Sequence, residues 1–194
     1  MPKVLFIVGP AGCGKSTSSR LIAQRLGAAY IDKDTVATGF TEALLTLAGT
    51  DPQERDNNAY YQAHVMDLEY ETILRIATDN LALGRDVVLD APFGRYLGRV
   101  NYLREAAQRY GWSDDVQPVV VHVAVNGEAV RTRLIERGLE RDAWKLAHWD
   151  EFWAKASNTD CAWEGAEHVG LDNTAEQPDV EAVIRALGLP GAHQ

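Results

Sequence analysis

Residues 9–17 read Gly-Pro-Ala-Gly-Cys-Gly-Lys-Ser-Thr and directly follow the apolar run Val4–Val8. This stretch fits the pattern G-x-x-x-x-G-K-[ST], which in phosphate-binding loops follows a strand and opens a helix. The glycines allow a turn in which successive backbone N–H groups point inward at phosphate oxygens, and the positive end of the following helix adds to the attraction. We expect Lys15 to reach the β- and γ-phosphates of a nucleotide and the Ser16 hydroxyl to bind Mg²⁺. The other expected nucleotide-binding residues of the loop are Gly9, Gly12, Cys13, Gly14 and Thr17.

Short apolar runs alternate with helical periods along the rest of the chain. The expected strands are Val4–Val8, Ala28–Ile31, Val87–Leu89, Val119–Val125 and His168–Leu171. All but the last are continuous apolar runs, which are typical of parallel strands buried on both faces. The alternation therefore predicts an α/β fold in which helices cover both faces of a five-stranded parallel sheet.

Two segments between the expected strands carry apolar residues at helical spacing, which predicts amphipathic helices. Their stripes are Val36, Phe40, Leu44 and Leu47 in the first, and Tyr96, Val100, Leu103, Ala107 and Tyr110 in the second. Gly111 follows the second stripe, as is common where a helix ends. The polar stretch 50–58 contains Pro52 and predicts a loop before a long helix that ends near Leu83.

Length, composition and charge are those of one globular domain. Of the 194 residues, 46% are hydrophobic and 24% charged, which excludes disordered, collagen-like and disulfide-scaffold chains. The formal net charge of −9 argues against long nucleic acid as a partner, because a protein that coats a duplex requires a large basic surface. Two cysteines are too few for a disulfide framework, no signal peptide precedes Val4, and no apolar stretch approaches the roughly 20 residues of a membrane helix. We expect a reduced, soluble, cytoplasmic protein with no membrane partner.

Carboxylates follow the second and third expected strands, and the carboxyl ends of parallel strands open on the ligand crevice of such a sheet. The second strand is followed by Asp32, Lys33 and Asp34. If the extended conformation continues, Asp32 and Asp34 point the same way and Lys33 points elsewhere. Asp34 is then a candidate to orient an acceptor hydroxyl, with an N-cap role before the next helix as the alternative. The third strand ends at Asp90 and has the form of a Walker B segment, so Ser16, Asp32 and Asp90 are the candidate metal ligands.

Arginines gather in the second half of the chain. Arg95 is expected to begin a helix, with Arg99 one turn further along. The two arginines would then hold an anionic or polyhydroxyl acceptor. The alternative is that they lie on a solvated face of the helix. Arg133, Arg137 and Arg141 are spaced four apart, with Gly138 indicating a bend. A flap over about 137–147 could close on a transferring phosphoryl group, and a salt-bridged surface helix is the alternative.

These residues together resemble the small P-loop phosphotransferases: shikimate and gluconate kinases, chloramphenicol phosphotransferase, zeta-toxin kinases and the AAA-type predicted ATP-binding kinases. The stretch 137–150 looks most like the last group. The resemblance implies a three-layer P-loop NTPase fold with strand order 2-3-1-4-5 and a short lid, bound ATP and Mg²⁺, and phosphoryl transfer to a small-molecule hydroxyl.

Residue roles carried over from this resemblance extend the expected site. The resemblance gives Asp34 the catalytic-base position, and Asp32 lies close enough to share metal or acceptor duties. It gives Arg137 a stacking role on adenine and Arg141 a phosphate contact, while Asn173 and Thr174 would hold the adenine edge. Residues 91–93 read Ala-Pro-Phe where shikimate kinases have a glycine triplet, so shikimate is not expected as the acceptor.

Two other functions are compatible with the motifs. One is a nucleotide or polynucleotide 5′-hydroxyl kinase in which Arg95 and Arg99 grip an acceptor phosphate. The other is an ATPase or nucleotide switch without a small-molecule acceptor, although the Asn-Lys-x-Asp tetrad of GTPase switches is absent. The acceptor would be read by residues of about 35–83, in which we find no pattern that identifies it, and the oligomeric state stays open.

Overall fold

The computed structural model describes residues 1–53, 55, 58–138, 142–157, 160–175 and 177–188. Five parallel strands form one sheet in the order β2-β3-β1-β4-β5, as the sequence and its resemblance predicted. The strands are β1 (Lys3–Val8), β2 (Ala29–Asp32), β3 (Val87–Asp90), β4 (Gln117–Ala124) and β5 (Glu167–Asp172). The central strand β1 pairs with β3 and β4, with Val4 opposite Val87 and Pro118.

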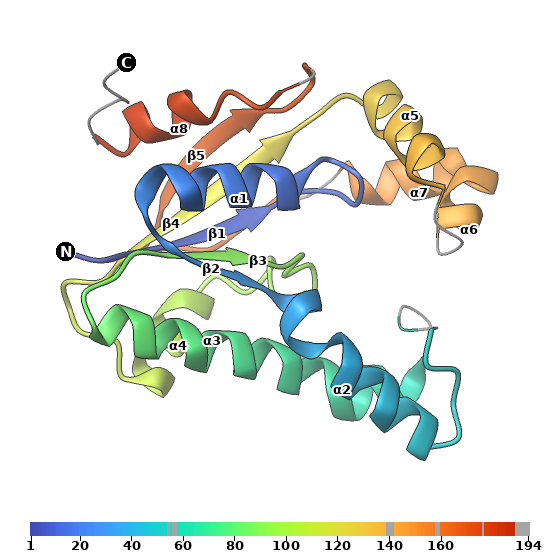
Figure 1. The fold of residues 1–194 in the computed structure, drawn as a ribbon, viewed down its shortest axis with the longest axis horizontal. Coiled ribbons are helices and arrows are strands. Elements are labelled where there is room, and N and C mark those ends of the chain that lie inside the picture. Colours follow the sequence, from blue (N-terminus) through green and yellow to red (C-terminus); the bar gives the residue numbers. More distant parts are fainter. Residues whose placement is uncertain (54, 56–57, 139–141, 158–159, 176, 189–194) are drawn as a thin grey trace.

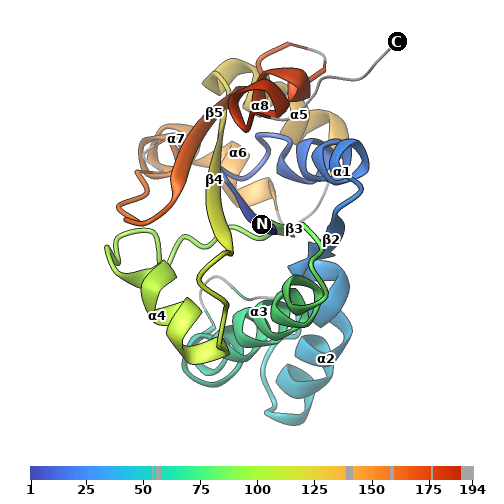
Figure 2. The same ribbon diagram turned by 90° about the vertical axis from the view of Figure 1, so that its left-hand side faces the viewer.

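Helices lie on both sides of this sheet, which confirms the predicted three layers (Figures 1 and 2). The helical elements are α1 (Lys15–Leu26), α2 (Lys33–Leu47), the π-helical turn η1 (Tyr61–Val65), α3 (Met66–Ala82), α4 (Tyr102–Tyr110), α5 (Gly127–Arg137), α6 (Ala143–Ala147), α7 (Trp149–Ala156) and α8 (Val180–Ala186). Because strand side chains alternate, β1 contributes to two cores. Val4, Phe6 and Val8 pack toward α3 and α4, whereas Leu5 and Ile7 pack toward α1 and α8. Within the described ranges, no helix combines the length and hydropathy that crossing a bilayer requires.

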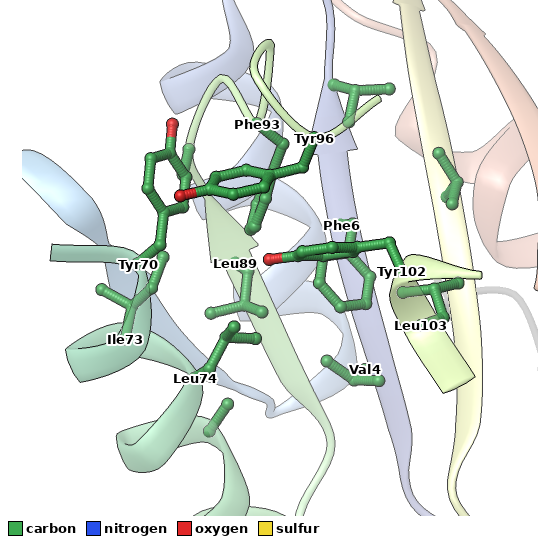
Figure 3. Packing of buried hydrophobic residues seen from close by; sticks show 14 of the residues in the cluster. Val4, Phe6, Tyr70, Ile73, Leu74, Leu89, Phe93, Tyr96, Tyr102 and Leu103 are labelled. Carbon is green, nitrogen blue, oxygen red and sulfur yellow. The ribbon is translucent and has the colours of Figure 1, made fainter. Parts of the chain in front are cut away.

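An aromatic cluster fixes the chain that leaves β3 (Figure 3). Phe93 is fully buried and its ring contacts those of Phe6, Tyr70 and Trp163 at centroid distances of 5.3, 5.1 and 5.5 Å. Its φ of 51° lies in the left-handed region, which costs a side-chain-bearing residue on the order of 1–2 kcal/mol. A strained backbone of this kind is kept only where the surrounding contacts hold it. The segment that follows the carboxyl end of β3 is therefore held firmly in place.

The second predicted helix begins later than its apolar stripe indicated. α4 starts at Tyr102, and Arg95 lies in a run of turns, so the prediction that a helix begins at Arg95 is wrong. The carbonyls of Tyr96, Leu97 and Val100 accept hydrogen bonds from residues 162–164. The carbonyls of Leu97 and Val100 serve this distant segment, and that of Tyr96 is shared with a turn bond from the Arg99 amide (2.9 Å). The run therefore forms turns, and Tyr96 and Leu97 pack into the aromatic core.

The first predicted stripe does not form the packing face of its helix. In α2 the side chains of Phe40 and Leu47 are 77% and 85% exposed. The buried residues of this helix are Lys33, Ala37, Thr41 and Leu45. The helix is therefore rotated away from the orientation that apolar burial alone would select. The buried face contains an ion pair of Lys33 with Glu69 of α3.

Candidate nucleotide and phosphoryl-transfer site

The glycine-rich loop joins the carboxyl end of β1 to the amino end of α1, on the side of the sheet toward which the strands point (Figure 1). Gly12 and Gly14 have φ angles of 80° and 87°, a conformation that favours glycine. A Cβ atom at Gly14 would also lie 2.2 Å from Asn173 Nδ2, and one at Gly12 would lie 2.9 Å from Leu134 Cδ2. The loop thus requires glycine at both positions for its conformation and for its contacts.

Replacement of Gly14 by alanine is expected to weaken both folding and nucleotide binding. The left-handed backbone should cost about 1 kcal/mol of unfolding free energy, and the displaced Asn173 should lower nucleotide affinity about 10-fold or more. The matched control is Gly27→Ala, because Gly27 has a φ of 63° but no atom within 4 Å of an added Cβ. Urea unfolding and titration with a fluorescent ATP analogue measure the two effects. Equal nucleotide affinity in the two variants would contradict the role of the Gly14–Asn173 contact.

Lys15 folds back over the loop. Its Nζ donates to the carbonyl oxygens of Gly9 and Pro10 at 2.8 and 2.7 Å and lies 3.9 Å from Cys13 Sγ. Cys13 is fully buried, and burial raises the pKa of its thiol despite the nearby ammonium. Cys13 therefore fills the interior of the loop as a small, protonated side chain. Thr17 lies in the first turn of α1 and is exposed.

A hydroxyl and two carboxylates meet beside the loop. Asp90 is 5% exposed; it accepts a 2.8 Å hydrogen bond from the Tyr30 hydroxyl and another from Ser16. Burial raises the pKa of Asp90, and the two hydrogen bonds oppose this rise. Asp32 is its direct register partner on the adjacent strand β2.

This donor set fits Mg²⁺, because hard oxygen ligands from one or two carboxylates, completed by water and substrate phosphate, are what the ion prefers. Among the described residues, no group of three or more His, Cys, Asp and Glu side chains could hold a metal by itself. Ser16, Asp32 and Asp90 are therefore suited to an ion shared with a nucleotide. Tyr30, which holds one oxygen of Asp90, was not predicted as a site residue.

Asp34 lies in the first turn of α2 with its side chain 53% exposed. Lys33 Nζ is 3.3 Å and Arg55 Nη1 3.8 Å from its Oδ1 atom. The helix cap is Asp32, which accepts hydrogen bonds from the Asp34 amide (2.9 Å) and the Thr35 hydroxyl (3.0 Å). Two expectations are therefore wrong: Asp34 does not cap the helix, and strand alternation does not extend past Asp32, where β2 ends. Asp34 remains at the edge of the same crevice.

The structure does not bring Arg95 and Arg99 to a common partner. Arg95 Nη1 donates to the Gln62 carbonyl at 2.9 Å and lies 3.6 Å from Asp67, which places it against η1 and α3. Arg99 forms a 2.5 Å ion pair with Glu105 on α4. Both side chains are about half exposed. The two arginines therefore contact different partners, and their placement does not support the prediction that they bind one acceptor together.

Arg133 on α5 joins the loop to the segment after β5. Its Nη2 donates to the carbonyls of Asn173 and Ala175 at 2.8 and 3.0 Å, while the buried Asn173 amide donates to the Cys13 carbonyl at 2.6 Å. Arg133 was named in the arginine run but not selected as a site residue. Its position one helical turn before Arg137 is the signal that could have selected it.

A cavity of about 490 Å³ opens between this arginine and the segment after β5. Its lining comes from two elements, α5 with the residue before it and the segment after β5, namely Asn126, Glu128, Ala129, Thr132, Arg133, Glu136, Thr174 and Ala175. Thr174 lines the cavity and Asn173 precedes it in the chain, and their role at the edge of a base stays a prediction. The cavity is next to the phosphate-binding loop, where a nucleotide base could lie.

Arg137 ends α5 and makes a double ion pair with the fully enclosed Asp142. Its Nε and Nη2 atoms donate to the carboxylate at 2.5 and 2.8 Å, and Lys145 Nζ donates at 3.0 Å. Burial opposes ionisation of Asp142, but these hydrogen bonds outweigh it and lower the pKa of the carboxyl. Arg141 lies outside the described residues. Of the two predicted lid arginines, the structure therefore describes only Arg137, which is engaged in an ion pair with Asp142.

The variant Asp142→Asn is expected to lower the unfolding free energy at pH 7 by about 2 kcal/mol, since charged hydrogen bonds contribute about 1.5–3 kcal/mol each. The folded-state pKa of Asp142 is lowered, so its contribution is complete above the unfolded value of about 3.9 and is lost as pH falls through the folded value. Urea unfolding between pH 7 and 3 should show a constant difference from the parent down to about pH 5 and a shrinking one below pH 4. The exposed Asp114→Asn is the control and should show no such difference.

Comparison with known proteins gives matches along most of the chain. The family model AAA_33, described as AAA domain, matches residues 4–158. A shikimate kinase of Thermosynechococcus vestitus is 47% identical over 38 residues, which are 20% of this chain and 21% of that protein. A bifunctional pantoate ligase/cytidylate kinase of Synechococcus sp. is 44% identical over 66 residues, which are 34% of this chain and 12% of that protein. The matched segments thus span less than a quarter of either relative's length.

Solved structures match over almost the whole chain. A protein from Chloroflexus aurantiacus has a TM-score of 0.66 at 18% identity, covering 96% of this chain and 97% of that one. A shikimate kinase from Bacteroides thetaiotaomicron has a TM-score of 0.55 at 16% identity, with coverage of 96% and 98%. A gluconokinase from Sinorhizobium meliloti 1021 has a TM-score of 0.51 at 18% identity, with coverage of 96% and 90%. At these identities the likeness is one of fold.

Proposed function

The chain belongs to the AAA domain family AAA_33, whose model covers residues 4–158, and from this premise we propose that it transfers the γ-phosphoryl group of ATP to a hydroxyl of a small molecule. One observation carries the proposal: a half-exposed carboxylate, Asp34, lies at the same sheet edge as the phosphate-binding loop and the Ser16–Asp32–Asp90 oxygen set. A carboxylate in this position can orient an oxygen nucleophile, water or an acceptor hydroxyl, and the screen described below distinguishes the two. The names of the relatives, shikimate kinase and gluconokinase, support the same class of reaction.

The nucleotide is bound mainly by the loop and Lys15. Backbone N–H groups of residues 11–17 and the amino end of α1 would hold the phosphates. Lys15 would exchange its bonds to the Gly9 and Pro10 carbonyls for bonds to β- and γ-phosphate oxygens, which are stronger because both partners are charged. The base would occupy the cavity beside Arg133 and Thr174, with Asn173 adjoining it.

Ser16, Asp32 and Asp90 would hold Mg²⁺. When bound, the ion supplies positive charge to the phosphate oxygens where negative charge develops. Tyr30 donates to Oδ2 of Asp90, and Ser16 makes a hydrogen bond to the same carboxylate. These bonds hold the carboxylate in place beside the loop.

Asp34 accepts the proton of the acceptor hydroxyl in this proposal. The hydroxyl oxygen forms a bond to the γ-phosphorus, the bond from that phosphorus to the β–γ bridging oxygen breaks, and ADP leaves with its electron pair. Arg137 and Arg141 are proposed to neutralise the transferring group once a lid over 137–147 closes, and residues 139–141 of that lid lie outside the described part. The unit is proposed to be one domain, residues 1–194, with the acceptor bound by residues 35–83.

A metabolite-library screen tests the proposal. Purified protein with ATP and Mg²⁺ should produce a mass gain of one phosphate in at least one hydroxyl-bearing compound, and none when Mg²⁺ is removed by chelation. Nucleosides, nucleotides and oligonucleotides belong in the same panel. ATP hydrolysis without any phosphorylated compound would contradict the proposal and favour an ATPase or switch.

A further inference from the structure

A buried carboxylate on α3 ties together the elements around Asp34. Glu69 is 3% exposed, and its two oxygens accept three hydrogen bonds. Lys33 Nζ and the Tyr61 hydroxyl donate to Oε2 at 2.6 and 2.7 Å, and the Thr41 hydroxyl donates to Oε1 at 2.5 Å. The donors come from α2 and η1, so one side chain joins three helical elements of the expected acceptor-binding region.

The ammonium of Lys33 stands between two carboxylates. Lys33 is 6% exposed; it lies 2.6 Å from Glu69 and 3.3 Å from Asp34. The guanidinium of Arg55 is 3.8 Å from each of the same two carboxylates. A buried ammonium needs a close partner of opposite charge, and Glu69 is the nearer of the two. Glu69 therefore leaves Asp34 only partly engaged by Lys33.

The apolar stripe of α2 does not set the rotation of the helix. α2 buries Lys33 and Thr41, and its buried face also holds the apolar Leu45, while Phe40 is 77% exposed. At about 100° per residue, the exposed apolar stripe is centred roughly 85° around the helix from the buried face. Burial of apolar area favours turning that stripe inward. The packing of Leu45 and the bonds to Glu69 oppose this turn, and the bonds to Glu69 are the buried polar ones between α2 and α3.

We propose that Glu69 is a positioning residue: by binding Lys33 and Thr41 it sets the rotation of α2 and thereby directs Asp34 into the crevice. The structural part of this inference concerns α2 alone, and its catalytic part rests on the proposed function. Without the charge of Glu69, Lys33 has Asp34 as its nearest carboxylate and pairs with it. The helix also becomes free to turn Phe40 toward α3.

The test compares Glu69→Gln with the control Glu71→Gln, which changes a partly exposed glutamate of the same helix that pairs with Arg75 and Arg109. Phe40→Cys is added to each background and to the parent, and 5,5′-dithiobis(2-nitrobenzoate) measures how fast the new thiol reacts. In proteins without the Phe40→Cys change, the reaction of Cys13 and Cys161 gives the background rate of labelling. We expect about 10-fold slower labelling with Glu69→Gln and parental labelling with Glu71→Gln.

Kinetics supply the second measurement, with the acceptor found in the screen. Without the reporter cysteine, Glu69→Gln should lower kcat about 100-fold and leave the KM for ATP within about 2-fold of the parent, since the loop and Lys15 are unchanged. Parental labelling together with parental kcat would overturn the proposal. If the screen finds no acceptor for the parent, the proposed function fails, and the labelling result alone decides whether Glu69 orients α2.

A double variant covers the case in which Glu69→Gln does not fold. Lys33→Met with Glu69→Leu removes both charges and fills the space with apolar atoms, an exchange that proteins commonly tolerate. If Glu69 only stabilises the fold, this variant should regain parental labelling at Phe40→Cys and parental kcat, which would overturn the proposal. Slow labelling and low kcat in a cooperatively folded double variant would support it.

Discussion

Replacement of Asp34 by asparagine is expected to lower phosphoryl transfer about 10²–10⁴-fold, the usual effect of losing a general base. Asparagine keeps the size of the side chain but cannot take the proton of the acceptor hydroxyl. The affinity for ATP should stay within about 2-fold of the parent, because the loop, Lys15 and the Ser16–Asp90 pair are unchanged. Direct nucleotide titration and single-turnover transfer separate binding from chemistry.

The control for this variant is Asp79→Asn, which changes an exposed aspartate of α3 by the same chemistry. It should transfer phosphate at the parental rate. Asp34 is half exposed and does not cap α2, so a large loss of stability in Asp34→Asn is not expected. Full transfer activity in a folded Asp34→Asn protein would remove Asp34 from the base position and leave Asp32 as the nearest alternative.

The variant Lys15→Met is expected to reduce phosphoryl transfer about 10²–10³-fold, the effect of removing one charged donor from a transition state. Methionine retains most of the length of the side chain but none of its charge. Nucleoside triphosphate should also bind about 10-fold more weakly, and the unfolding free energy should fall by about 1–3 kcal/mol. The bonds that Lys15 makes in this structure go to the carbonyls of Gly9 and Pro10, two buried residues that would lose their charged donor.

Lys155→Met is a suitable comparison, because Lys155 is 74% exposed and pairs with Glu151 on α7. It should match the parent in binding and in transfer. Stopped-flow mixing with a fluorescent ATP analogue measures the affinity, and labelled ATP measures transfer. Parental transfer by Lys15→Met would mean that the loop amides alone hold the γ-phosphate.

The fold class and the loop could be predicted because local residues specify them. Continuous apolar strands are typical of a parallel sheet, and the pattern from Gly9 to Ser16 determines its own backbone turn. The strand order and the residue roles came from a resemblance. The structure agrees with the order, whereas the roles stay predictions to be tested.

The errors arose where a distant partner decides the local conformation. Helical periodicity placed Phe40 on a buried stripe, but the buried face of the helix contains Lys33, which bonds to Glu69, 36 residues away. Periodicity likewise extended a helix back to Tyr96, whose carbonyl accepts a bond from Trp163 as well as a turn bond from the Arg99 amide. Local spacing carries no information about such partners. Both errors concern the sides of the crevice, where the acceptor is expected to bind.

The pairing of β1 has a consequence for how the protein is made. Val4 pairs with Val87 on one side and with Pro118 on the other, so both partners of the first strand are synthesised long after it. At about 5–20 residues per second, the ribosome needs roughly 4–17 s to reach β3. During this time the apolar segment Val4–Val8 has neither neighbouring strand. Until β3 has been made, this segment therefore stays exposed to water unless another contact, such as a chaperone, covers it.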